Sequence, residues 1–154
     1  MKKFIIFLEI ILLVTGCGKT INKLDLKKTK DIIEESLKDM KDIEDDSLTD
    51  VYGLDLNLME EHVFKLNDNV DLYAIIKTKE KAKVKNEMTK YFEKVQKFNT
   101  NYSPERIEIL NNRVEKEIGD YLIYIVAKNA DTIYKSIIDS MWYFRGLIFL
   151  WIIE

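Results

Sequence analysis

Hydrophobic residues recur along the chain with two spacings that alternate from segment to segment. From Asp25 onwards they follow one another at three- and four-residue steps, with Lys, Asp and Glu between them. Such steps place apolar side chains on one side of a helix, so this segment predicts an amphipathic helix. Its apolar positions are Leu26, Ile32, Ile33, Leu37, Met40 and Ile43. The pattern breaks over Ser47–Asp55.

The following segments alternate with a period of two. His62–Leu66 and Val70–Lys77 flank Asn67–Asn69, a polar run that is typical of a turn. In the second segment Val70, Leu72, Ala74 and Ile76 would face one side of a sheet, with Tyr73 and Ile75 on the other. The pattern therefore predicts two strands joined by a turn.

Helical spacing returns over Lys79–Asn99, where one stripe is apolar. The stripe consists of Val84, Met88, Phe92 with Tyr91 beside it, Val95 and Phe98. Residues 99–103 end this predicted helix, and Pro104 prevents its simple continuation because proline lacks a backbone N–H.

A second predicted hairpin brackets Gly119-Asp120, with arms at Arg113–Ile118 and Tyr121–Lys128. Tyr121–Ala127 is apolar at every position, which favours a central strand covered on both faces. Ala130–Phe144 predicts the last helix. Its inward residues would be Ile133, Ile137, Ile138, Met141 and Trp142.

The predicted order is therefore helix, two strands, helix, two strands, helix. It indicates a two-layer α+β fold, in which three helices pack on a small antiparallel sheet of about four strands. We expect one domain over residues 24–140 and an apolar, aromatic tail over residues 141–154.

The tail has three open interpretations. Before Glu154 it contains 13 residues, which as a helix would reach only about 20 Å, less than the roughly 30 Å of a hydrocarbon core. It would extend the last helix into the core, lie in the membrane interface, or dock another protein.

The first residues are typical of a cleavable export signal. Lys2 and Lys3 precede an apolar run over Phe4–Val14 that contains Glu9. Val14-Thr15-Gly16-Cys17 resembles the lipobox of bacterial lipoproteins. The resemblance implies a signal peptide over residues 1–16, cleavage between Gly16 and Cys17, a diacylglycerol on the Cys17 thiol, acyl chains such as palmitate, and a tether over residues 17–23. The alternative is an ordinary or uncleaved signal with a chance cysteine.

Charge and cysteine content narrow the possible partners. With residues 1–16 removed, 22 basic and 26 acidic side chains would remain, a net charge of −4. This slight acidity argues against nucleic acid as a partner. Because Cys17 is the only cysteine, no disulfide can form within the chain.

Few residues suggest catalytic or metal chemistry. His62 is the only histidine, so a zinc site lacks ligands and no cofactor is expected. It lies beside Glu60 and Glu61, and no Gly-x-Ser-x-Gly elbow is present, so a Ser-His-Asp relay is not indicated. Acidic residues are plentiful, and a facing pair could perform glycoside hydrolysis. Those considered are Glu34, Glu35, Asp39, Asp42, Glu44, Asp45 and Asp46.

Four segments resemble a known family. They are Tyr52–Asp55, Ala74–Lys77, Tyr102–Glu105 and Gly119–Lys128. In order and spacing behind a lipobox they are similar to the Gram-positive lipoproteins that carry the "domain of unknown function" numbered forty-three fifty-eight. The resemblance covers roughly Leu24 to Ile138. It implies a location and an architecture, and it brings no activity or catalytic residues.

These patterns favour a membrane-anchored lipoprotein on the extracytoplasmic face, whose domain binds an envelope protein or peptide rather than catalysing. The candidate contact residues are Tyr102, Trp142 and two lysines of the lysine-rich predicted helix, Lys90 and Lys94. The alternatives are an extracytoplasmic hydrolase that uses paired carboxylates and a purely structural envelope component.

Overall fold

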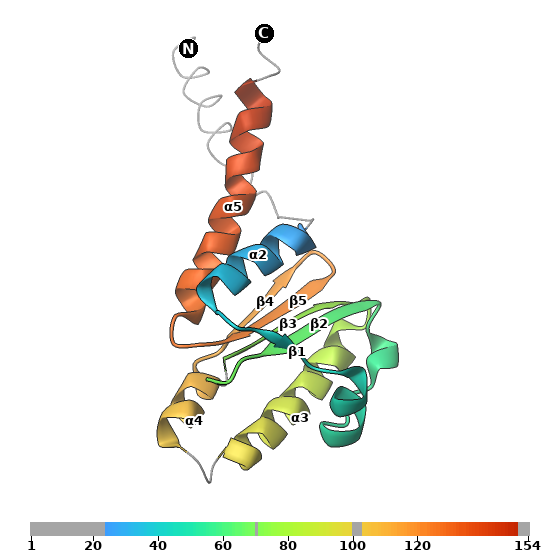
Figure 1. Ribbon diagram of the computed structural model, residues 1–154. Coiled ribbons are helices and arrows are strands. Elements are labelled where there is room, and N and C mark those ends of the chain that lie inside the picture. Colours follow the sequence, from blue (N-terminus) through green and yellow to red (C-terminus); the bar gives the residue numbers. More distant parts are fainter. Residues whose placement is uncertain (1–23, 70, 100–102, 151–154) are drawn as a thin grey trace, which may run out of the picture.

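A single antiparallel sheet of five strands forms the centre of the molecule (Figure 1). The computed structural model describes residues 24–69, 71–99 and 103–150, without the side chains of residues 98, 99 and 142–150. The strands are β1 (Lys41–Asp42), β2 (Glu61–Leu66), β3 (Leu72–Lys77), β4 (Val114–Ile118) and β5 (Tyr121–Val126). Their order across the sheet is β1-β2-β3-β5-β4, so β3 and β5 are central.

Helices cover both faces of this sheet. On one face lie α2 (Leu26–Ser36) and α5 (Ala130–Leu150), and on the other lie α3 (Lys81–Asn99) and α4 (Pro104–Asn111) (Figure 1). Two short elements, the π-helix η1 (Ser47–Val51) and the 3-10 helix η2 (Leu56–Leu58), adjoin α3. The fold is α+β, as predicted, but it has three layers where two were expected.

The alternation of β3 explains the third layer. Leu72, Ala74 and Ile76 belong to the core under α3, whereas Tyr73 and Ile75 belong to the core under α2 and α5. Tyr73 and Ile75 of β3 are paired in register with Ile125 and Ile123 of β5, respectively. Because both central strands are apolar on both faces, each face requires its own cover of helices. The predicted facing of the β3 residues is confirmed, while Val70 lies outside the described residues.

Both hairpins are confirmed, and so are the stripes of α3 and α5 as far as side chains are described, which leaves out Phe98 and Trp142. Val84, Met88, Tyr91 and Phe92 are buried on α3, as are Ile133 and Ile137 on α5. In the turn between β4 and β5, Gly119 has a φ of 56°, a conformation that glycine adopts without steric cost.

The first predicted helix is too long, because α2 ends at Ser36. Asp39 then takes a φ of 59° and turns the chain, so that Lys41 and Asp42 pair with Leu66 and Lys65 of β2. Met40 packs on one face of the sheet and Ile43 on the other. The three-residue step between Met40 and Ile43 therefore belongs to an extended segment, whose hydrogen bonds with β2 replace those of another helical turn.

Helix α4 was not predicted. Pro104 occupies its first turn, where the missing N–H removes no hydrogen bond and the fixed φ suits a helix. Leu110 of α4 is buried, and Ile109 packs partly against the same core as α3. Pro104 therefore begins this helix as well as separating it from α3.

Candidate ligand-binding cavity

An apolar cavity of about 330 Å³ lies on the α3 side of the sheet. It is enclosed by η1, α3, α4 and the ends of β2, β3 and β5, and its apolar or aromatic lining residues come from all of them. These are Val51, Tyr52, Leu66, Leu72, Tyr91, Val95, Ile109, Leu110 and Val126. Three polar residues complete the lining: Asn69, Asp71 and Arg106. The cavity therefore combines a continuous apolar wall with a small polar group.

Aromatic packing on α3 forms one wall of this cavity. The ring of Tyr91 lies 4.7 Å from that of Tyr52, 6.0 Å from that of Phe64 and 5.3 Å from that of Phe92, measured between centroids. These separations are those of favourable tilted and edge-to-face pairs. The cluster joins η1, β2 and α3, and it fixes Tyr91 beneath the cavity.

The Tyr91 hydroxyl is the only buried side-chain polar atom without a hydrogen-bond partner in the described part of the chain. Burial raises the pKa of Tyr91 well above the ordinary tyrosine value, and the nearby Tyr52 raises it further. Tyr91 is therefore neutral at physiological pH. A buried hydroxyl without a partner costs free energy, so this position is not optimised for the stability of the empty protein.

A lysine fastens η1 to α3 beside the cavity. The Lys94 Nζ donates a hydrogen bond of 2.7 Å to the carbonyl oxygen of Tyr52. The adjacent Gly53 has a φ of +71°, and a Cβ there would lie 2.9 Å from the Lys94 Nζ. This contact therefore needs both a glycine and a long cation. The ammonium of Lys94 is occupied within the fold, and its predicted role as a partner contact stays a prediction.

The polar lining lies at the turn between β2 and β3 and on α4. The Asn67 side chain closes this turn, since its Oδ1 accepts from the Asp71 N–H at 2.9 Å and its Nδ2 donates to the Asp71 carboxylate at 3.1 Å. Glu105 is the main cause of the raised pKa of Lys128, and Asp71 adds a smaller electrostatic contribution. Among the described residues, the Arg106 guanidinium makes no ion pair and no hydrogen bond. Arg106 is thus a cation that lines the cavity without an ion pair or hydrogen bond to the described residues.

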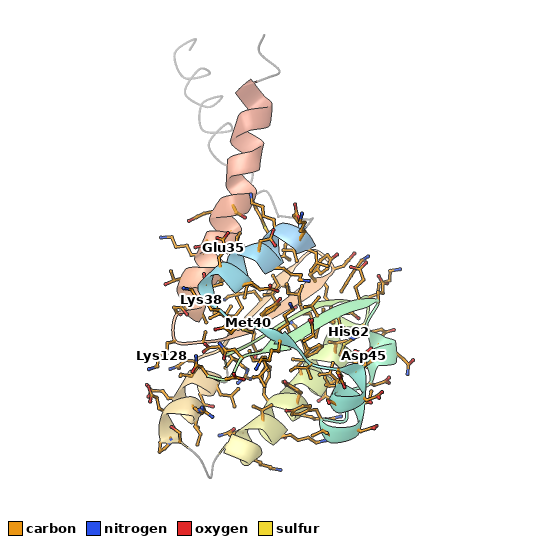
Figure 2. The ribbon with its side chains drawn as sticks, viewed as in Figure 1. Glu35, Lys38, Met40, Asp45, His62 and Lys128 are labelled. Atoms are coloured by element: carbon orange, nitrogen blue, oxygen red, sulfur yellow. The ribbon has the colours of Figure 1, made fainter. Side chains whose placement is uncertain are left out.

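A second hollow of about 380 Å³ adjoins the cavity through shared residues. Asn69, Asp71, Arg106 and Ile109 line both spaces. The other residues of the second hollow are mostly polar: Ser36, Leu37, Ser103, Glu105, Lys128 and Asn129. Lys128, seen near α4 in Figure 2, pairs with Glu105. A ligand that occupies both spaces would pass from an apolar to a polar environment at Arg106.

Among the described residues, the side chain of His62 pairs with an aspartate. Its Nε2 lies 2.9 Å from the Asp45 Oδ1, and the two side chains adjoin between β2 and the start of η1 (Figure 2). In the part of the chain that the structure describes, His62 hydrogen-bonds to no serine, threonine or cysteine. Sequence analysis placed His62 beside Glu60 and Glu61. Its actual partner is 17 positions away in the chain, so the pair arises from the fold.

The acidic residues that approach one another are bridged by lysines. Lys65 Nζ lies 3.0 Å from Glu34 and 3.6 Å from Asp42, and Glu34 also accepts a 2.5 Å hydrogen bond from Tyr73. Burial favours a higher pKa for Glu34, but the contacts with Tyr73 and Lys65 outweigh it and lower the pKa. Among the described carboxylates, every resolved pKa shift is downward. A glycosidase requires one carboxylic acid with a raised pKa, so this arrangement does not favour that chemistry.

No group of three or more His, Cys, Asp or Glu residues able to hold a metal occurs among the described residues. In the same part of the chain, no helix has the length and apolar character needed to cross a membrane.

The lysine-rich helix also proves to be well paired. The contacts are Lys79–Glu60, Lys81–Glu117, Lys83–Glu80, Lys85–Glu117 and Lys90–Glu87. Lys90, a predicted partner contact, is exposed and lies 2.8 Å from Glu87 one turn earlier. This face is therefore largely neutralised and offers less unpaired positive charge than the sequence suggested.

Gly16, Cys17 and Tyr102 lie outside the described residues, and Trp142 is described only through its backbone in α5. The sequence patterns predicted neither the cavity nor the place of Arg106 in its lining. They indicated Tyr91 only as part of the apolar stripe of α3. The one signal of a further role for Tyr91 was its hydroxyl, a polar group at a position predicted to be buried.

The comparisons with known proteins agree with one of the sequence-based expectations. A search of curated proteins and a search of solved structures gave no match. The family comparison matches residues 33–127, more than half of the chain, to the "Domain of unknown function (DUF4358)". This range begins within α2 and ends just after β5, so it contains the whole sheet, α3 and α4. The chain belongs to the DUF4358 family.

Proposed function

We propose that this protein is a lipoprotein anchored on the extracytoplasmic face of the membrane, and that its domain binds a small amphipathic anion. Two separate arguments support the two parts. The anchor rests on the amino-terminal sequence, and the binding role rests on the cavity between α3, α4 and the sheet.

The anchor argument depends on Cys17. A positive and then apolar leader precedes a lipobox-like Val14–Cys17, with the only cysteine at the position that lipoproteins acylate. One acyl chain binds a membrane reversibly, whereas two hold a protein firmly, at about 0.8 kcal/mol per buried methylene. A diacylglycerol on Cys17 would therefore retain the domain at the membrane without a spanning helix.

The cavity is the single observation that carries the binding role. Its volume of about 330 Å³ lies at the lower end of the range for small-molecule sites, roughly 300–1,000 Å³. Its lining follows the usual composition of such sites, an apolar and aromatic wall with a few polar groups that set orientation. Glu105, which lines the adjoining hollow, has a pKa lowered by its contact with Lys128, so binding accounts for the geometry better than acid catalysis.

The charge of the cavity selects the class of ligand. Asp71 is engaged by Asn67 and acts on Lys128, and Glu105 pairs with Lys128. The Arg106 guanidinium, in contrast, makes no ion pair and no hydrogen bond in the described part of the chain. Its planar guanidinium suits a carboxylate or phosphate. The expected ligand has an apolar body within the cavity and one anionic group at Arg106.

The anchor is tested by changing Cys17→Ala in the cell. Wild-type protein should fractionate with membranes and carry a mass increase on an amino-terminal cysteine. The variant should accumulate as an unprocessed precursor or leave the membrane, while Lys19→Ala, two residues away, behaves as wild type. Processing and membrane retention that persist in Cys17→Ala would refute lipidation at this residue.

Ligand binding is tested with three probes that share one apolar body: 4-phenylbutyrate, 4-phenylbutanol and 4-phenylbutylamine. Calorimetric titration of the full chain, in lipid nanodiscs if it purifies with membranes, should rank the anion tightest and the amine weakest. Arg106→Gln should reduce the preference for the anion over the alcohol at least fivefold, whereas Glu108→Gln on the same helix should preserve it. Equal affinities for the three probes, or none, would contradict the proposal.

A further inference from the structure

Helix α5 extends beyond the body of the domain. Met141, the last residue of α5 whose side chain is described, packs partly against the core under α2, and the backbone remains helical to Leu150. Figure 1 shows this last part of α5 rising past α2, away from the sheet and from α3 and α4. At 1.5 Å per residue, the nine residues after Met141 extend the helix by about 14 Å. The family match ends at residue 127, before α5 begins.

The beginning of the described chain lies at the same end of the molecule. Lys28, in the first turn of α2, donates a 3.0 Å hydrogen bond to the Ser140 carbonyl of α5. Leu24 is buried in the same core as Ile137 and Met141. The chain therefore enters the domain close to the level at which α5 leaves it.

The sequence of the extension has the composition of an interfacial segment. Residues 142–153 contain two tryptophans, one tyrosine and one arginine, and the remainder is apolar apart from Gly146. Tryptophan and tyrosine concentrate at the level of lipid head groups, and arginine extends its charge towards water from such a depth. This composition is typical of a segment that contacts lipid, and it differs from the charged surfaces typical of helices in soluble proteins.

We propose that residues 142–153, which comprise the last part of α5 and the residues that follow it in the sequence, insert into the membrane interface as a second point of attachment. The proposal rests in part on lipidation at Cys17. Leu24 lies seven positions after Cys17, and this stretch of chain spans at most about 25 Å, more than the extension of α5. A lipid on Cys17 and the end of α5 therefore reach the same bilayer surface. Two attachments fix an orientation that a single flexible tether leaves free.

This orientation places the cavity on the side away from the bilayer. The cavity lies among η1, α3 and α4, on the opposite face of the sheet from α2 and α5. Figure 1 shows α3 and α4 at the end opposite to the extension of α5. The domain would thus present its binding site outward.

The two tryptophans provide a native probe, because Trp142 and Trp151 are the only ones in the chain. The full chain is reconstituted into bilayers that contain dibrominated phosphatidylcholine, whose bromines quench nearby tryptophan. Fluorescence should fall by at least half, with stronger quenching by bromines at shallow positions than by those near the bilayer centre.

Matched variants locate the effect in the tail. Leu147→Glu with Leu150→Glu should lower the quenching at least threefold, since it adds two carboxylates to the apolar segment. Thr132→Glu with Ser136→Glu adds the same charge on an exposed part of the same helix and should leave the quenching unchanged. Both pairs preserve the tryptophans.

The outcomes separate the two attachments. Quenching that persists in Cys17→Ser protein mixed with the same vesicles supports an independent membrane contact by the tail. Membrane-bound wild-type protein without tryptophan quenching would overturn this inference while leaving lipidation intact. Absent quenching together with dimers in analytical ultracentrifugation would assign the extension to a second copy of the chain and would also overturn it.

Discussion

Two buried tyrosines on opposite faces of the sheet have contrasting hydroxyl environments. Tyr73 donates to Glu34, whose carboxylate also contacts Lys65. Tyr91 has a buried hydroxyl without a partner. An unsatisfied buried hydroxyl costs about 1–3 kcal/mol, whereas a hydrogen bond to a charged group contributes about 1.5–3 kcal/mol. Replacing each tyrosine by phenylalanine should therefore change the free energy of unfolding in opposite directions at the two positions.

We expect Tyr91→Phe to raise the free energy of unfolding by about 1 kcal/mol, because it removes only the unpaired oxygen. Tyr73→Phe should lower it by about 2 kcal/mol through loss of the bond to Glu34. Urea denaturation of both variants measures the two values. Destabilisation by Tyr91→Phe of the size seen for Tyr73→Phe would show that the Tyr91 hydroxyl has a partner in solution.

Glu34 predicts a specific acid sensitivity. Its pKa in the folded protein is below that of the unfolded chain, so its stabilising contribution is complete above the unfolded pKa, close to 4.5, and is lost as the pH falls through the folded value. Glu34→Gln should therefore lower stability at pH 6–7 and flatten its decline below about pH 5. Urea midpoints from pH 3 to 7 test this, and parallel curves for the two proteins would contradict it.

At the scale of elements, one lysine joins η1 to α3. Lys94→Met should destabilise the protein by about 1–2 kcal/mol, because it removes a charged donor from the Tyr52 carbonyl at a part-buried position. The matched change on the same helix, Lys90→Met, breaks only the exposed pair with Glu87 and should cost about 0.5 kcal/mol or less. Thermal unfolding distinguishes the two. Equal effects would show that the Lys94 contact contributes no more than a surface pair.

Sequence patterns predicted those elements whose determinants are local. Alternation identified β2 and β3, and an uninterrupted apolar run identified the doubly covered strand β5. The sequence patterns did not predict β1, because its partner residues Leu66 and Lys65 lie more than 20 positions later in the chain. They also failed for α4, because Pro104 can end one helix or begin another. Whether a proline ends a helix or begins one depends on what the neighbouring segment packs against.

At the scale of the whole molecule, the cavity could not be predicted because its lining comes from six separate elements and a turn. Tyr52 and Tyr91 adjoin only after η1 packs on α3, and Arg106 is brought to the cavity by α4. The lipobox is the opposite case, since its whole signal is contained in a few consecutive residues. The proposed anchor can therefore be predicted from the sequence, whereas the proposed ligand site depends on the assembled fold.

The separation of these two regions leads to a prediction for the entire protein. Because the described chain begins at Leu24 in the core under α2 and α5, on the opposite face of the sheet from the cavity, the proposed anchor and the ligand should act independently. Cys17→Ala should bind 4-phenylbutyrate within twofold of the wild-type affinity. A larger change, measured by titration calorimetry, would reveal coupling between the amino-terminal segment and the cavity.

The outer strands of the sheet have a consequence for a protein concentrated at a surface. β1 has only two residues, and the middle of β4 is Glu115-Lys116-Glu117, all exposed. Short or charged outer strands discourage another chain from extending the sheet. Neighbouring molecules crowded into one plane would otherwise have frequent opportunities to join their sheets into fibrous aggregates. At a membrane that the proposed anchor would reach, the short and charged outer strands of this sheet would discourage neighbouring copies from joining their sheets.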